Sequence, residues 1–228
     1  YSILIKGVEV GRGPLQVGKL MAMDSGDIKE KIEGVEFIEP VFNLNAIWIE
    51  PDNRDTAESR GYTVVDCPTI VATHLTEIIK RHADEILGRE EVKKLIDNIN
   101  GDYPAVVKEV LEKMSYGEIQ KVLQNLLRER VSIRNMVTIL ETLATYVDYT
   151  KDSGMLTEYV RAALARQITG AYVAEGNILS VITVDPDIEG IIRDSIHDDP
   201  VEGRVLGLDP DTHSAIVNSL LDAYQRAS

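Results

Sequence analysis

The chain is poor in several residue types, and each shortage excludes a class of protein. One of its 228 residues is a cysteine, Cys67, which excludes an internal disulfide framework and a cysteine-rich zinc site. Aromatic residues make up 5% of the chain, too few to favour a platform on which nucleic-acid bases stack. No uncharged run exceeds ten residues, whereas a helix that crosses a bilayer needs roughly 20 apolar residues.

Basic residues are also scarce. There are 24 Lys and Arg against 38 Asp and Glu, a net charge of −14, which argues against electrostatic capture of nucleic acid or of an anionic membrane and leaves basic partners possible. The net charge is −5 over residues 1–66, −1 over 67–166 and −8 over 167–228. A solvated surface is the simplest explanation for most of this acidity.

The chain is large enough for more than one folding unit. Hydrophobic residues make up 44% of it, and its length predicts one large domain or two to four small ones. It begins with Tyr1 rather than Met, and residues 2–10 already have a strand pattern. We therefore expect a piece of a longer protein, whose preceding residues, including any membrane segment, cannot be judged from this sequence.

The hydrophobic period predicts strands first and helices later. Residues 2–10, 19–24, 46–50 and 62–66 are expected to be strands, with a helix over 51–60. From Pro68 the period is helical, with Asp66 as a cap. The apolar residues expected on one face there are Val71, Leu75, Ile78, Ile79 and Ile86.

The remaining chain divides into two expected regions. Residues 88–169 are expected to form a helical bundle, in which Ser115 and Glu118 make a capping box. Residues 177–184 are expected to be a strand, followed by helices near 187–196 and 212–226. Because a lone strand leaves unpaired edges, that strand would need a partner from distant sequence or from beyond residue 228.

No catalytic or metal-binding constellation emerges from the residues. Gly11 and Gly13 do not have the spacing of a phosphate-binding loop and are expected in turns. Cys67 and His74 would lie roughly 10 Å apart along a helix, too far to share a proton. His74 and His82 have no Glu between them in a metalloprotease arrangement. The Asp-Pro-Asp sequences at 185–187 and 209–211 lack the rest of a calcium loop and are expected to be turns or helix caps.

The most informative segment is Glu39-Pro40-Val41-Phe42, just before the apolar run 46–49. Phe42 is one of two phenylalanines in the chain. It could be a core aromatic that fills the turn. Alternatively, it could form a partly exposed apolar dimple with a carboxylate at its rim, a surface suited to gripping a partner helix.

Several longer strings carry a resemblance to a known family. They span about residues 1–168 and occur here in the order of the FHIPEP family, at residues 5–11, 39–42, 46–49, 61–66, 71–75, 121–127 and 138–144. The chain resembles the cytoplasmic portion of the family's flagellar export-gate members, and less closely that of its virulence type III members. After residue 168 the likeness is weak.

The resemblance implies an α+β architecture of four subdomains. The first, a split α/β subdomain, would lie at 1–17 and 67–86, with its N-terminal part missing. A ferredoxin-like subdomain would be inserted at 18–66, followed by a helical subdomain at 87–166 and a C-terminally truncated α/β subdomain at 167–228.

The resemblance also implies a function without catalysis or cofactor. The parent protein would be a multi-pass protein of the bacterial inner membrane, with this part on its cytoplasmic side. It would bind export chaperones with their substrates and soluble components of the export ATPase complex, in a ring that is nonameric in the family. Without the linker and the last strands, this piece is expected to be monomeric in dilute solution. Alternatives are the gate of a virulence system and, unrelated to either, a small-molecule enzyme with a cleft between subdomains.

The family's docking site carries over to named positions. Glu39, Phe42 and Thr73 match its acidic, aromatic and threonine positions, and Val65 and Ile70 match apolar neighbours. The resemblance implies an anchoring role for Phe42, a charge partner in Glu39 and a rim hydroxyl in Thr73. This chain departs from the family by having Glu39 where Asp is usual and Asn43 where Gly is usual.

Overall fold

A computed structural model describes residues 1–26, 28–174, 176–199 and 203–227. The chain divides into two units, Tyr1–Ile168 and Thr169–Ser228, each described here by itself. Both contain helices and small antiparallel sheets, so the fold is a mixture of α and β structure.

The first unit opens with a β-hairpin rather than with one long strand. Strands β1 (Ser2–Ile5) and β2 (Val8–Arg12) pair antiparallel, so the expectation of a continuous strand over 2–10 is wrong. Lys6 and Gly7 have φ angles of 50° and 84°, the left-handed backbone of a two-residue hairpin turn. Gly11 lies in β2 rather than in a turn.

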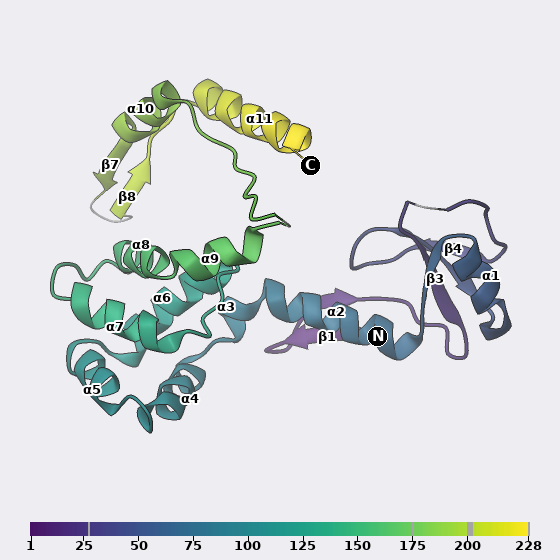
Figure 1. Ribbon diagram of the computed structural model, residues 1–228, viewed down its shortest axis with the longest axis horizontal. Coiled ribbons are helices and arrows are strands. Elements are labelled where there is room, and N and C mark those ends of the chain that lie inside the picture. The colour runs from purple at the N-terminus through teal and green to yellow at the C-terminus, as the bar shows by residue number, and fades with distance from the viewer. Residues whose placement is uncertain (27, 175, 200–202, 228) are drawn as a thin grey trace. The chain divides into compact units, whose positions relative to one another are not determined.

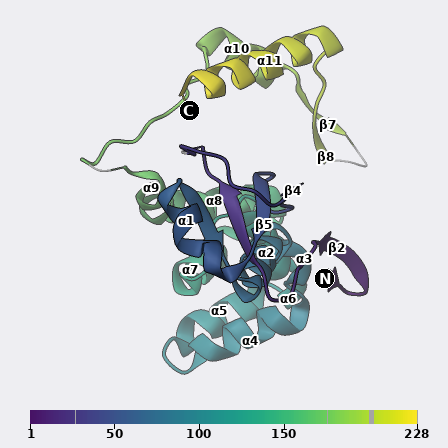
Figure 2. The same cartoon turned by 90° about the vertical axis from the view of Figure 1, so that its right-hand side faces the viewer.

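A four-stranded antiparallel sheet follows, in the order β4-β5-β3-β6. Its strands are β3 (Leu20–Asp24), β4 (Val35–Ile38), β5 (Asn45–Ile49) and β6 (Tyr62–Val65). The short helices η1 (Pro51–Asn53) and α1 (Arg54–Ser59) connect β5 to β6. The structure confirms the strands expected near 19–24, 46–50 and 62–66 and the helix near 51–60, and it adds β4. Figure 2 shows this sheet with α1 toward the viewer.

The sheet has a separate apolar cluster on each face, as the alternation of strand side chains requires. One cluster contains Leu20, Ile47 and Ile49. The other contains Met21, Ala46, Trp48 and Ile70. Trp48 stacks on Phe37 of β4 with ring centroids 5.0 Å apart. The second cluster includes a residue from the following helix, which fixes that helix against the sheet.

That helix, α2 (Cys67–Arg81), begins where the sequence predicts. The Asp66 carboxylate accepts the Thr69 N–H at 2.9 Å, and Pro68 lies in the first turn. In Figure 1, α2 runs from the sheet to the helical bundle with the β1–β2 hairpin beside it.

The expected buried face of α2 is largely wrong. The buried residues are Ile70, His74 and Ile78, whereas Leu75 and Ile79 are 43% and 49% exposed. The buried side faces the hairpin and the sheet cluster, and the apolar residues next to it line an open groove. That groove has a volume of about 410 Å³ and also includes Ile3, Leu4, Ile5, Lys6 and Ile86.

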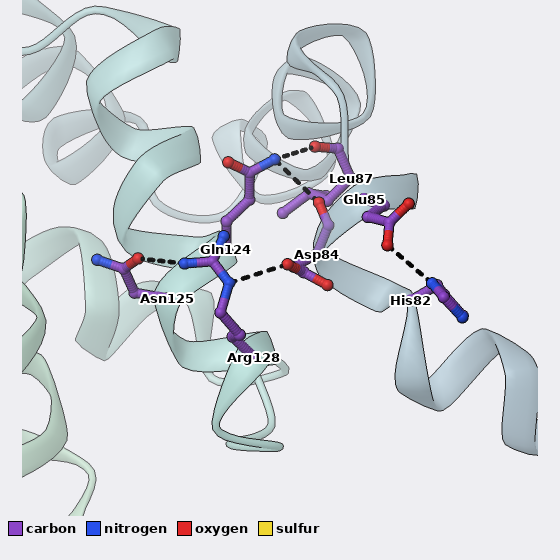
Figure 3. Close-up of polar contacts among 7 residues, drawn as sticks. All are labelled: His82, Asp84, Glu85, Leu87, Gln124, Asn125 and Arg128. Carbon is purple, nitrogen blue, oxygen red and sulfur yellow. Dashed lines mark hydrogen bonds and ion pairs between the residues drawn. The ribbon is translucent and has the colours of Figure 1, made fainter. Parts of the chain in front are cut away.

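A short helix, α3 (Ala83–Ile86), joins α2 to the bundle, and polar contacts hold it there (Figure 3). Gln124 donates from Nε2 to the carbonyl oxygens of Asp84 and Leu87 at 2.9 and 3.1 Å. Arg128 donates to the Asp84 carboxylate at 3.0 Å. His82 and Glu85 lie 2.8 Å apart on the α2 side. The joint is therefore fixed largely by side chains of a later helix.

The helical bundle predicted for residues 88–169 is confirmed. Its helices are α4 (Arg89–Asn100), α5 (Pro104–Lys113), α6 (Tyr116–Arg128), α7 (Met136–Tyr146), α8 (Ser153–Ala163) and α9 (Ala165–Tyr172). They enclose one core that includes Leu123, Ile139 and Leu140. The capping box is present, since Ser115 Oγ accepts the Glu118 N–H and the Glu118 carboxylate accepts the Ser115 N–H.

The second unit contains α10 (Pro186–Asp194), the hairpin β7 (Ile196–Asp199) and β8 (Gly203–Leu206), and α11 (Pro210–Ala227). Both expected helices are confirmed, and Asp185 and Asp209 cap their first turns. The strand expected at 177–184 is wrong, because that segment makes only an isolated bridge from Ala174 to Ile178. Its Val181 is 68% exposed, and no strand among the residues that the structure describes pairs with this segment. Within the described residues, no helix has the length and apolar character to cross a membrane.

Candidate functional site

The loop between β4 and β5 is organised around the side chain of Glu39. The Glu39 N–H donates to the Leu44 carbonyl at 2.9 Å and closes the loop. Glu39 Oε2 accepts the Val41 N–H at 2.9 Å, and Oε1 accepts the Phe42 N–H. The residue is 1% exposed. Its carboxylate therefore lies beneath the loop and satisfies backbone donors there.

This loop presents Phe42 to solvent. Val41 is buried at 8% exposure, whereas Phe42 is 52% exposed, so of the two alternatives left by the sequence the structure has the partly exposed aromatic. Asn43 has a φ of 58°, in the left-handed region that glycine adopts freely and asparagine tolerates better than most residues. This backbone explains why Asn can occupy a position where the family resemblance implies Gly.

The other predicted site residues lie at the junction of β6 and α2. Ile70 is buried in the sheet cluster that contains Trp48, and Val65 packs against that cluster at partial exposure. Thr73 is half-buried on α2, next to His74. The helix is held there by the Asp66 cap at its start and by the burial of Ile70 and His74 one turn apart.

His74 lies in the middle of α2 and is 5% exposed. Its Nδ1 is hydrogen-bonded to the Tyr1 hydroxyl at 2.7 Å. Burial lowers the pKa of His74, an effect that the charge of Glu39 opposes and that of Arg81 reinforces. Arg81 also donates from Nη2 to the Val41 carbonyl at 3.4 Å. The loop carrying Phe42 is thus in contact with the last turn of α2 and electrostatically close to its middle.

Close packing around His74 also constrains the hairpin. A Cβ atom at Gly11 would lie 3.0 Å from His74 Nε2 and 3.1 Å from Ile78 Cδ1, tighter than ordinary van der Waals contact. Gly11, which has no side chain, therefore leaves the space that the imidazole ring of His74 occupies. Tyr1 supplies the second wall by an edge-to-face contact with the His74 ring, at 5.6 Å between centroids.

Sequence reasoning missed three residues of this site, namely Val41, His74 and Arg81. His74 was considered for proton transfer and metal binding, but it is four residues from both Ile70 and Ile78, and that spacing places it on their helix face. For Arg81 there was no signal, because its acceptor is a backbone carbonyl 40 residues away. Among the described residues, no group of three or more His, Cys, Asp or Glu could hold a metal ion.

The buried histidine leads to a pH prediction. Because the pKa of His74 is lowered in the folded protein, the unfolded chain binds a proton there more readily, and acid favours unfolding. The stabilisation from a neutral His74 is fully present above about pH 6.5, and it is lost as the pH falls through the lowered pKa. The loss is at most about 1.4 kcal/mol per pH unit.

Urea unfolding of the native chain and of His74→Gln, from about pH 7.5 down to pH 5, checks this expectation. The free energy of unfolding should fall less steeply with acid in the variant. His213→Gln is the control, because His213 is exposed on α11. Equal slopes for the native chain and His74→Gln would contradict the assignment.

Comparison with known proteins agrees with this structure. The model of the FHIPEP family matches residues 1–228. The chain is 45% identical over 229 residues to the flagellar biosynthesis protein FlhA of Bacillus subtilis, covering 100% of this chain and 34% of that protein. It therefore spans about a third of the length of this curated relative.

Solved structures share the fold. The nonameric SctV-C of EPEC, determined by cryo-EM, is 28% identical with a TM-score of 0.75, over 97% of this chain and 67% of that one. The Chlamydia pneumoniae CdsV protein in its complex with CdsO is 25% identical with a TM-score of 0.77, over 96% of this chain and 62% of that one. Because the family model spans every residue and a relative is 45% identical along the whole chain, the chain belongs to the FHIPEP family.

Proposed function

We propose that this chain is part of the cytoplasmic docking platform of a flagellar type III export gate. It would bind export chaperones that carry their substrates and help to order secretion during flagellum assembly, without catalysing a reaction. The observation that carries the proposal is the half-exposed Phe42, held on a loop against α2 in a member of this family. An exposed aromatic next to an apolar surface is a typical anchor for a partner protein.

The alternative is the gate of a virulence type III system, which would share the fold and the docking mode with different cargo. Sequence identity to known members distinguishes the flagellar gate from the virulence gate. The flagellar relative is 45% identical, whereas the SctV and CdsV chains are 28% and 25% identical. This difference favours the flagellar assignment.

The assembly of the parent protein belongs to the same proposal. We infer a multi-pass protein of the bacterial inner membrane whose cytoplasmic part, with the four subdomains implied by the resemblance, forms a ring. The SctV-C structure is nonameric, and CdsV was solved in complex with CdsO. By analogy, the partners proposed here are further copies of this chain and soluble components of the export ATPase complex.

Within the site, each residue has a proposed part. Phe42 is the apolar anchor, and Val65 and Ile70, which lie in the sheet cluster, are assigned to the same site as its apolar positions. Thr73 offers a hydroxyl from the half-buried face of α2. Glu39 is assigned to the same site.

Replacing Phe42 by Ala tests the proposal. If Phe42 is the anchor, affinity for a flagellar chaperone–substrate complex from the same organism should fall by about 30-fold or more, the effect of losing a hot-spot aromatic. Isothermal titration calorimetry would measure this. The variant should keep its thermal stability, because the ring is 52% exposed.

The matched control is Tyr149→Ala, which removes an aromatic ring that is 80% exposed on the helical bundle. Its affinity should equal that of the native chain. Unchanged binding by the Phe42→Ala variant would remove Phe42 from the docking site.

A further inference from the structure

The carboxylate of Glu39 is already engaged within its own loop. Both of its oxygens accept backbone N–H groups, from Val41 and from Phe42, and the residue is 1% exposed. A side chain that makes an ion pair with a docking partner needs access to that partner. Meeting one here would require the loop to open and the N–H groups of Val41 and Phe42 to lose their acceptor, which is unfavourable.

The pattern of these hydrogen bonds identifies what the side chain does. An acceptor at position i that binds the N–H groups of i+2 and i+3 holds a turn in the manner of an Asx turn or a helix N-cap. Here positions i+2 and i+3 are the buried Val41 and the exposed Phe42. The left-handed Asn43 follows directly, and the Glu39 N–H to Leu44 bond closes the other side.

We propose that Glu39 is a positioning residue, which acts on docking by fixing the backbone of Phe42 so that the ring stays outside, and that its negative charge is not read by the partner. This inference rests on the proposed function for the identity of the partner. The claim about the loop rests on the geometry alone.

Other acceptors should be able to hold the same turn. Asp and Asn are the residues that most often accept N–H groups two and three positions ahead, and both are one methylene shorter than Glu. Asn has no charge, so it separates the two possible roles. A positioning role predicts that Asn replaces Glu39 well, whereas a charge partner predicts that Asn is as poor as Ala.

The binding experiment compares Glu39→Ala, Glu39→Asn and Glu39→Asp with the native chain, using the same flagellar chaperone–substrate complex. Affinity should fall about fivefold or more in the Ala variant, the ratio typical of a lost cap. It should stay within about twofold of native in the Asn and Asp variants, because each retains a side-chain oxygen whose two lone pairs can accept both N–H groups. An Asn variant that binds as weakly as the Ala variant, while Asp binds normally, overturns the proposal.

A second measurement needs no partner. Amide hydrogen exchange at Val41 and Phe42 in the free chain should be faster in Glu39→Ala than in the native chain, and close to native in Glu39→Asn. Equal exchange in the native chain, Glu39→Ala and Glu39→Asn would show that the side chain does not hold the loop. If the Ala variant fails to fold, the Asn and Asp variants still decide the question, since they have the same length, each offers a side-chain oxygen that can accept N–H groups, and only Asp is charged.

Failure of the proposed function is distinguishable from failure of this inference. Normal binding by Phe42→Ala contradicts the proposed docking site. The role of Glu39 in holding the loop is then decided by the hydrogen-exchange result alone. Weak binding by Phe42→Ala together with weak binding by Glu39→Asn and normal binding by Glu39→Asp keeps the docking site and returns Glu39 to the role of a charge partner.

Discussion

Replacing Leu140 by Ala is expected to lower the free energy of unfolding by about 2–5 kcal/mol. Leu140 is 0% exposed in the core of the helical bundle, on α7, which packs against α4, α5 and α8. Removing its side chain there loses apolar burial and leaves a cavity that rigid helices fill only in part. Urea unfolding monitored by circular dichroism would measure the loss.

The matched control is Leu75→Ala, the same substitution at a residue that is 43% exposed on α2. Since that side chain lines an open groove, its truncation leaves no closed cavity and should cost well under half as much. Similar losses at the two positions would mean that the groove on α2 is filled in solution.

The second large effect is expected at Gly34, just before β4. A Cβ atom there would collide with Ile47 Cγ2 and would lie 2.7 Å from the Trp48 carbonyl oxygen. Because one of these neighbours is backbone in the adjacent strand, β4 itself must shift. Gly34→Ala should destabilise the chain by about 1–3 kcal/mol, the usual cost of overpacking.

The displacement should also reach the candidate site, since β4 leads directly into the loop that carries Phe42. Heteronuclear NMR would show shifted amide signals along β4 and residues 39–44. The control is Gly101→Ala, because Gly101 has helical backbone angles and open space around its added Cβ. A native-like spectrum and stability for Gly34→Ala would contradict the close approach.

Local patterns were enough to predict most elements. Alternation predicted β3, β5 and β6, and caps such as Asp66 and Ser115 predicted where helices begin. These features depend on neighbours in the sequence. Gly7 indicated a turn in a hairpin-like portion, but Lys6 carries no turn signal, since Lys is uncommon at positive φ, and the expected strand over 2–10 therefore ran through the turn.

Features that depend on distant partners were not predictable in the same way. On α2, an apolar row was expected to be buried, but the position of the hairpin makes Ile70, His74 and Ile78 the covered face. The apolar residues at 177–184 suggested a strand, although the described residues offer them no adjoining strand beyond the bridge to Ala174. In both cases the sequence shows which residues are apolar, but it does not show which part of the fold packs against them.

The candidate site shows the same division. The sequence and its family resemblance identified Glu39 and Phe42 as a pair, and the exposure of Phe42 was one of two expectations. They could not show that the Glu39 carboxylate turns inward, because its acceptor role depends on a loop conformation that includes the left-handed Asn43. The sequence therefore suggested that Glu39 places a charge at the rim of the site, whereas in the structure its carboxylate binds the backbone of the loop that carries Phe42.

The joint at α3 has a consequence for how freely this region can vary in evolution. Gln124 binds the carbonyl oxygens of Asp84 and Leu87, and every residue type offers a carbonyl oxygen. These two contacts therefore restrict the amide at position 124 and make no demand of their own on the side chains at 84 and 87. The Asp84 to Arg128 pair joins two side chains, so changes there would need to occur together. Substitutions in the connecting helix can thus leave its backbone contacts in place, provided that Gln124 and also Gln120, which donates to the Leu87 carbonyl at 2.9 Å, are retained.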